Sequence, residues 1–138
     1  MVQQIILRDL KKPQKVHLYD DIEWLGESFG FCEGRDIDGT MKKIIHTILD
    51  EISKKGSTST EEISKNLNIE VQRVNYHLRT LINSGFVRRE KRTIILRQES
   101  VKATIDEIRK DANRIFDNLA DIAEEIDRNL GLKNRQKN

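Results

Sequence analysis

The chain has 138 residues, of which 36% are hydrophobic and 35% are charged. This proportion of charge argues against a large buried enzyme core and indicates a small, helix-rich, soluble protein. Cys32 is the single cysteine, which excludes an intrachain disulfide, and no apolar run approaches the ~18 residues that span a bilayer. The first residues also lack the pattern of a signal peptide, so we expect a cytoplasmic protein without a membrane partner.

The net charge of +2 hides an uneven distribution along the chain. Residues 39–98 carry 12 basic and 6 acidic side chains, whereas residues 1–38 and 99–138 have net charges of −3 and −1. A basic centre between acidic flanks is typical of a nucleic-acid-binding domain with separate assembly elements. A solvated basic face is the alternative interpretation.

The first segment predicts two short strands and a helix. The β-prone residues 5–7 and 16–18 flank a turn signal at residues 11–13. Asp20 or Asp21 is then placed to cap a short helix. The apolar face of that helix consists of Ile22, Leu25 and Phe29. A glycine-rich loop is expected to follow it.

The central segment predicts three helices. Apolar residues recur every three or four positions over 40–55, as in a helix packed on a core. Ser59 precedes Glu62 by three residues, which forms a capping box at the start of a short helix over 60–66. A third helix is expected over 70–84, with an apolar face of the same kind.

A β-hairpin is expected after these helices. Asn68 favours a turn before the third helix, and Gly85 is expected to end that helix. Residues 86–89 and 92–97 predict two strands joined by a tight turn at residues 90–91. This order of helices and strands is that of a winged helix-turn-helix.

The last segment has the strongest periodicity. Eight apolar residues are spaced alternately four and three positions apart, which is the 3.5-residue repeat of a coiled-coil seam. They are Val101, Ile105, Ile108, Ala112, Ile115, Leu119, Ile122 and Ile126. A helix over 100–130 would be about 45 Å long, more than a small domain covers, so we expect dimerisation through this seam. Folding back on the chain's own N-terminal segment is the alternative, and both arrangements are compatible.

Residues 67–87, LNIEVQRVNYHLRTLINSGFV, resemble the recognition-helix segment of ArsR-type winged-helix transcriptional regulators. The shared residues, in order, are Leu67, Val74, His77, Leu78, Leu81, Gly85, Phe86 and Val87. The resemblance covers about residues 40–97. It implies a mainly α fold, a winged helix-turn-helix with a short β-hairpin wing. The long coiled-coil-like C-terminal helix is also similar to the dimerisation helices of such regulators, and many archaeal members of the family are built this way.

The helix over 70–84 is expected to read base edges in the major groove. Its outward positions are Gln72, Arg73, Asn75, Tyr76 and Arg79. Arginine can bridge two acceptors on guanine, and amide side chains can pair bidentately with adenine. We expect Gln72, Arg73 and Tyr76 to reach bases and Arg79 to contact a phosphate. Glu70 departs from the family's usual serine or threonine, and its charge would repel a phosphate.

The predicted wing is strongly basic. Its cations are Arg88, Arg89, Lys91, Arg92 and Arg97, against the single acid Glu90. Such a hairpin suits the minor groove or the flanking phosphates. Strand alternation places Arg88 and Arg89 on opposite faces, so we expect at most one of the two to face the groove. Edge-strand charges that prevent aggregation are the alternative.

No catalytic, metal or cofactor site is expected. Metal-sensing members of the ArsR-type family use a cysteine motif near the recognition helix or acids and histidines on the last helix, and neither pattern occurs here. Residues 36–39 only faintly resemble a calcium loop. His77 is expected to pack between helices, and His17 and His46 have no evident partner.

Four of the seven aromatic residues lie within thirteen positions: Tyr19, Trp24, Phe29 and Phe31. We expect them to cover the base of the long helix. The alternatives are an effector pocket and a surface for the transcription machinery. Cys32 beside them is a weak candidate for a redox sensor.

These observations predict an N-terminal β/helix extension (1–38), a winged DNA-binding domain (39–98), a dimerisation helix (99–131) and a flexible tail (132–138). The function that fits them is a homodimeric, non-enzymatic regulator that binds double-stranded DNA. Its half-sites are expected to lie about one helical turn, roughly 34 Å, apart. The alternative is a winged-helix protein-interaction module in a transcription or chromosome-maintenance complex.

Overall fold

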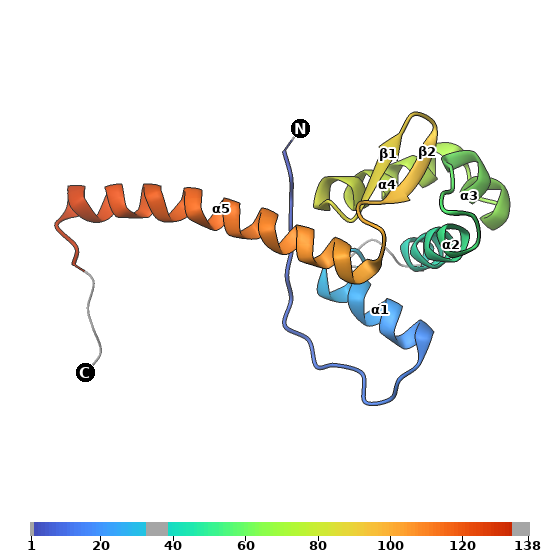
Figure 1. Cartoon of the computed structure of the whole chain (residues 1–138), viewed down its shortest axis with the longest axis horizontal. Coiled ribbons are helices and arrows are strands. Elements are labelled where there is room, and N and C mark those ends of the chain that lie inside the picture. The colour runs from blue at the N-terminus through green and yellow to red at the C-terminus, as the bar shows by residue number, and fades with distance from the viewer. Residues whose placement is uncertain (1, 33–38, 134–138) are drawn as a thin grey trace.

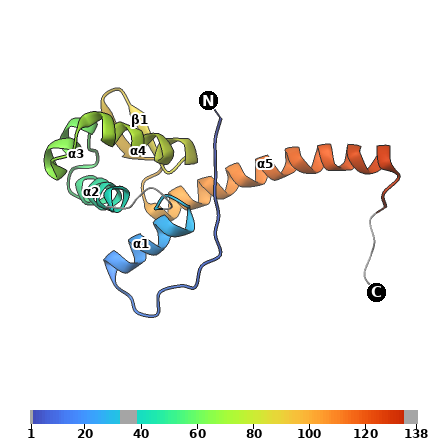
Figure 2. The ribbon, with the colours of Figure 1, turned by 180° about the vertical axis from the view of Figure 1, so that it is seen from behind.

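The computed structural model describes residues 2–32 and 39–133. Its elements are α1 (Leu18–Ser28), α2 (Thr40–Lys55), α3 (Thr60–Leu67), α4 (Val71–Ser84), β1 (Val87–Glu90), β2 (Thr93–Leu96) and α5 (Val101–Leu130). Helices α1–α4 and the hairpin form one compact body, from which α5 projects (Figure 1 and Figure 2). The predicted mainly helical fold with a hairpin and a long C-terminal helix is confirmed. Within the described ranges, no helix combines the length and apolarity needed to cross a membrane.

The core lies where α2, α3, α4 and the hairpin meet. Its fully buried side chains include Ile44, Ile48, Ile63, Val74, Leu78, Leu81, Phe86 and Ile94. Burying each of these large side chains stabilises the fold by roughly 1.5–3 kcal/mol relative to exposure. Phe29 and Phe31, which follow α1, stack with ring centroids 5.4 Å apart, and both rings lie against Phe86. The end of the N-terminal segment therefore closes the same core.

The helix boundaries follow from local chemistry. The Oγ of Ser59 accepts a hydrogen bond from the amide of Glu62 at 3.1 Å, as the capping box requires. Asn68, with φ of 54°, and Gly85, with φ of 91°, end α3 and α4 in the left-handed conformation. Compared with the predictions, α2 matches, α3 ends one residue later, and α4 and α5 each begin one residue later. Ser100 caps α5 by accepting from the amide of Ala103 at 3.0 Å.

The hairpin turn lies one residue later than predicted. Strands β1 and β2 pair from Val87 with Leu96 to Glu90 with Thr93, so the turn residues are Lys91 and Arg92 rather than 90–91. Phe86 is drawn into the core and does not belong to the strand. A third backbone segment adds to this sheet, because Thr58 and Ile94 exchange hydrogen bonds at 2.8 and 3.0 Å.

The two strands predicted in the N-terminal segment are wrong. Residues 2–17 contain no strand, and Leu18 already begins α1, with His17 as its N-cap in place of Asp20 or Asp21. A β-prone segment needs a neighbouring strand for its backbone groups. This segment instead makes isolated backbone hydrogen bonds to other elements. One example is the hydrogen bond from the amide of Gln4 to the carbonyl of Asn83, at 3.0 Å. Asp20 and Asp21 lie in the first turn, where carboxylates favour the helix dipole.

Candidate nucleic-acid interface

Helix α4 buries one face and exposes the other. Val74, Leu78, Leu81 and Ser84 are buried in the core that α4 forms with α2, α3 and β1. The exposed residues are Val71, Gln72, Arg73, Tyr76, Arg79 and Thr80. Four of the five outward positions predicted for this helix are therefore exposed. The fifth, Asn75, is half-buried.

Asn75 was expected to face DNA, and in the structure its amide oxygen contacts other side chains of the protein. Its Oδ1 accepts hydrogen bonds from the Oγ1 of Thr60 at 3.1 Å and from Nη2 of Arg89 at 3.4 Å. Arg89 also donates to Thr60 through Nη1 at 3.3 Å. These three side chains connect the start of α3, the middle of α4 and strand β1. Asn75 thus positions the hairpin against α4, because its acceptor oxygen is used within the protein.

Arg73 lies at the opposite edge of the exposed face, next to α2. Its Nη2 donates to the Oγ1 of Thr40 at 3.0 Å, and Thr40 is the first residue of α2. Arg73 is nevertheless an exposed residue. Tyr76, between these two edges, is exposed and meets the ring of His77 edge to face at 5.2 Å. His77 is half-buried, as a residue that packs between helices would be.

The hairpin cations differ in what they contact. Arg88 pairs with Glu90 at 3.1 Å, and both are exposed on one face of β1. Arg89 faces α3 and α4, so the expected separation of Arg88 and Arg89 to opposite faces is confirmed. Among the described residues, Lys91 and Arg92 at the turn are exposed and have no polar side-chain partner. The tip of the hairpin therefore presents two uncompensated positive charges.

This arrangement agrees with the comparison to known families. Residues 41–88 match the family model described as winged helix-turn-helix DNA-binding. The match begins inside α2 and ends in β1, so it includes α3 and α4, and α4 occupies the position that the recognition helix has in helix-turn-helix domains. The hairpin β1–β2 that follows is the wing. No curated protein and no solved structure is significantly similar to the chain.

Arg97, expected among the wing cations, is instead held inside the molecule. Its Nη2 donates to Oδ1 of Asp111 on α5 at 3.0 Å, and its Nη1 contacts the other carboxylate oxygen. Gln3 donates to the same carboxylate at 2.8 Å and to the carbonyl of Ser84 at 3.2 Å, and Arg114 donates at 3.2 Å. We call Gln3, Arg97 and Asp111 the anchor cluster. It joins the end of the recognition helix, the end of the wing, α5 and the N-terminal segment.

The anchor cluster is closely packed and electrostatically matched. The side chain of Asp111 is only 5% exposed. The adjacent Arg97 guanidinium, together with the amide of Gln3 and the charge of Arg114, holds the pKa of this carboxyl well below its usual range. Gly85, where α4 ends, has a φ of 91°, which favours glycine, and a Cβ there would also lie 2.7 Å from Nη1 of Arg97 and 2.9 Å from Nε2 of Gln3.

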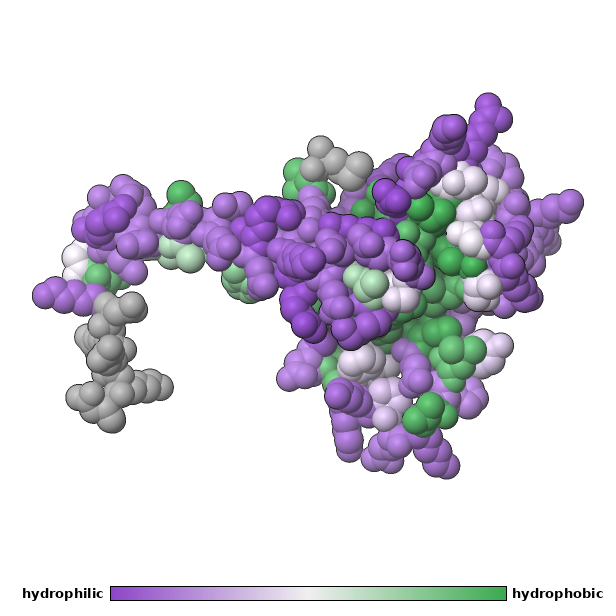
Figure 3. All heavy atoms as spheres, viewed as in Figure 1, coloured by the Kyte–Doolittle hydropathy of each residue, from purple (hydrophilic) through white to green (hydrophobic). Residues whose placement is uncertain are grey.

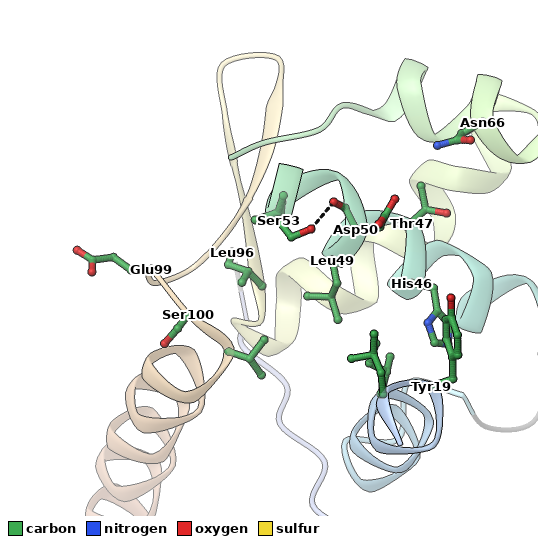
Figure 4. A pocket seen from close by; sticks show the side chains of 14 residues that line it. Tyr19, His46, Thr47, Leu49, Asp50, Ser53, Asn66, Leu96, Glu99 and Ser100 are labelled. Carbon is green, nitrogen blue, oxygen red and sulfur yellow. Dashed lines mark hydrogen bonds between the residues drawn. The ribbon is translucent and has the colours of Figure 1, made fainter. Parts of the chain in front are cut away.

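A groove lies on the body at the base of α5, away from the anchor cluster. It consists of two adjacent hollows of about 810 and 400 Å³, whose shared lining is Ile22, Leu49 and Val101. We call these two hollows the base groove. Figure 4 shows the larger hollow, where Tyr19 of α1 lies beside His46 of α2 with ring centroids 5.0 Å apart, while Glu99 points away. Trp24 lines the smaller hollow and donates to the carbonyl of Leu10 at 3.3 Å.

The four clustered aromatic residues thus have separate roles. Phe29 and Phe31 belong to the core, whereas Tyr19 and Trp24 line the base groove. His17, which had no evident partner in the sequence, lies 3.7 Å from Asp20. No cluster of potential metal ligands occurs within residues 2–32 and 39–133. Most of the weak calcium-loop pattern at residues 36–39 lies outside the described residues.

Proposed function

We propose that this protein is a sequence-specific, double-stranded DNA-binding transcriptional regulator of the ArsR type that acts as a homodimer. The recognition helix would enter the major groove, and the wing would contact the minor groove or the flanking phosphates. Gln72, Arg73 and Tyr76 are the proposed base contacts. Arg79, Arg88, Lys91 and Arg92 are the proposed phosphate or minor-groove contacts, with Arg89 and Asn75 holding the wing in place.

One observation carries this proposal. The segment that matches a DNA-binding family model contains α4, and both α4 and the wing carry exposed basic side chains. Residues 71–97 contain seven basic side chains and a single acid, Glu90. Only Arg97 among these cations is turned inward to a buried carboxylate. The other six are exposed, although Arg88 and Arg89 point to opposite faces of β1.

The test is the salt dependence of binding to a duplex, measured by fluorescence anisotropy. Each phosphate contact adds about 0.9 to the slope of log K against log salt. We expect the double variant Lys91→Ala/Arg92→Ala to lower the slope by about 2 and to weaken binding to all sequences. Absence of binding at low salt would favour the protein-interaction module instead.

A matched control removes the same charge elsewhere. Lys102 and Lys110 are exposed on the base of α5, where each pairs with an acid on its own helix. The variant Lys102→Ala/Lys110→Ala is expected to keep the slope of the wild type. Equal losses in both double variants would mean that the protein responds only to net charge and that the wing is not the contact surface.

The homodimer is supported by the projecting part of α5. Five large apolar residues on it are each at least 50% exposed: Phe116, Leu119, Ile122, Ile126 and Leu130. We call these five residues the tip stripe. Figure 3 shows hydrophobic residues on the projecting helix among hydrophilic ones. An apolar face of this length in water favours association, and the seam residues Ile108 and Val101 nearer the body already pack on the core.

A further inference from the structure

The tip stripe is an uncovered apolar surface, and the base groove, which has a mostly apolar smaller hollow and a mixed larger one, is also open in the described chain. The tip stripe lies on the second half of α5, and the base groove begins at Val101, the first residue of α5. The 30 residues between the two ends of α5 span about 45 Å. A continuous helix cannot fold back, so one chain cannot bring its own tip stripe to its own base groove.

From this placement we infer that two copies pair through antiparallel α5 helices, and that the tip stripe of each copy lies in the base groove of the other. A twofold axis near the middle of α5 would relate the two copies. Both contacts then form together, because each copy has one tip stripe and one base groove. In this register Leu130 of one copy lies near Val101 of the other, and Ile126 lies near Ile105. This inference rests on the homodimer proposed above and assigns its surface and orientation.

The charge of α5 favours the same orientation. Residues 116–130 carry five acids and one base, a net charge of −4, whereas residues 101–115 carry four bases and three acids, a net charge of +1. A parallel pair would place the two −4 halves side by side, where like charges repel. An antiparallel pair places each −4 half beside a +1 half. The lining of the base groove carries Lys12 against the acids Asp21, Asp50 and Glu99, so this attraction comes from the α5 helices and not from the groove.

The width of the tip stripe also agrees with a groove as its partner surface. Leu119, Ile122 and Ile126 belong to the 3.5-residue seam, but Phe116 and Leu130 lie beside it. A two-stranded coiled coil needs only the seam, whereas a wider apolar face is typical of a helix packed on more than one element. The base groove provides walls from both α1 and α2 in addition to the second α5.

This orientation changes the expected DNA site. In a parallel pair the two bodies lie side by side, and half-sites about one helical turn apart follow. In the antiparallel pair the two bodies lie at opposite ends of helices about 45 Å long. We therefore expect half-sites about two turns apart, roughly 68 Å, because half-site spacing follows multiples of the helical repeat.

Single-cysteine cross-linking tests the orientation in the full chain. In a Cys32→Ser background, Val101→Cys and Leu130→Cys chains are mixed, dialysed together and oxidised. We expect the cross-linked species to contain one chain of each kind, and Leu130→Cys alone to stay uncross-linked. Self-linking of Leu130→Cys chains would overturn the antiparallel arrangement while leaving the homodimer intact. A monomer in sedimentation would remove both the homodimer and this inference.

A distance measurement checks the register without touching either surface. A spin label on Asp127→Cys, an exposed position outside the tip stripe, is placed in the same Cys32→Ser background. The proposed register separates the two labels by 23 residues of helix, about 35 Å along the axis. A distance between the labels of about 20 Å or less, the width of two helices, would overturn the proposed register. Such a distance would arise from a parallel pair or from an antiparallel pair that overlaps only at the C-terminal ends of α5.

Discussion

Arg73, Asn75 and Arg79 lie within two turns of α4, yet their polar groups have different surroundings. The amide oxygen of Asn75 accepts hydrogen bonds within the protein, Arg73 donates to Thr40 and is exposed, and Arg79 is exposed. A hydrogen bond to the protein fixes a side chain and lowers the entropy that binding has to overcome. We therefore regard Arg73 as the best oriented of the proposed base contacts.

Replacing Arg73 with Ala is expected to reduce discrimination between a specific and a random duplex by ~1–3 kcal/mol. The measurement is the ratio of the two dissociation constants at one salt concentration. Thr40→Val is the control, because it removes the hydrogen bond to Arg73 and keeps the positive charge. An equal loss on both duplexes for Arg73→Ala would argue that this arginine contacts a phosphate and reads no base.

At Asp111 the expected effect is on stability and its pH dependence. Asp111→Asn should lower the free energy of unfolding at pH 7 by about 1–3 kcal/mol, because Arg97 loses its charged acceptor. The folded pKa of Asp111 lies below its unfolded value of about 3.9. The unfolded state therefore binds more protons in that range, and the wild type should lose stability as pH falls below about 4.

Urea unfolding at several pH values checks this expectation. The Asp111→Asn variant should have a flatter pH profile than the wild type below pH 4. Asp106→Asn is the matched control on the same helix, since Asp106 pairs with Lys102 at a far more exposed position, and we expect little change from it. Parallel profiles for wild type and Asp111→Asn would show that other carboxylates cause the acid sensitivity.

At the scale of elements, two small clusters fix the DNA-facing surface. Thr60, Asn75 and Arg89 hold the wing to the helix-turn-helix, and the anchor cluster holds the end of the recognition helix to α5. The wing turn is the strained part of this surface. Lys91 has a φ of 57°, in the left-handed region that costs a side chain with a Cβ roughly 1–2 kcal/mol.

Comparing Lys91→Gly with Lys91→Ala should therefore separate the effect of the backbone conformation on stability from the effect of the charge on DNA binding. We expect a gain in unfolding free energy of up to about 1 kcal/mol, together with a decrease of about 0.9 in the salt slope for DNA binding. Lys91→Ala removes the same charge without relieving the backbone, so it should share the loss of slope but not the gain in stability. An unchanged slope in both variants would remove Lys91 from the proposed DNA contacts.

At the scale of the whole molecule, the body and the projecting half of α5 are expected to contribute to different properties, folding stability and association. The body buries its own core, whereas the tip stripe contributes nothing to that core because its side chains are exposed. Stability of the body and association of the chain are therefore expected to respond to different substitutions. Regulators that bind paired half-sites need both properties.

The variant Leu119→Lys/Ile126→Lys is expected to be monomeric by light scattering, with the unfolding free energy of its body nearly unchanged. Its binding to a single half-site should persist, whereas its preference for paired half-sites should be lost. Asn113→Lys/Ala120→Lys adds the same two charges at exposed positions outside the tip stripe and should stay dimeric. A dimeric Leu119→Lys/Ile126→Lys protein would contradict the role assigned to the tip stripe.

The sequence by itself determined the elements from α2 onward. Helical periodicity, the Ser59 cap and the stops at Asn68 and Gly85 are local signals, and each reflects a hydrogen bond or backbone angle within a few residues. The exposed polar residues of α4 were predictable from the same helical periodicity. The apolar positions define the buried face of the helix, so the remaining positions face outward.

Only the tertiary structure decided which polar side chains make hydrogen bonds or ion pairs within the protein. Asn75 and Arg97 looked free in the sequence, but their partners lie 15 and 14 residues away on other elements. Residues 5–7 looked like a strand, yet no neighbouring strand is available, and the segment crosses α5 instead through Gln3 and Asp111 (Figure 1). The base groove also arises from α1, α2 and α5 together. Contacts of this kind depend on how elements pack in three dimensions, which local propensity does not encode.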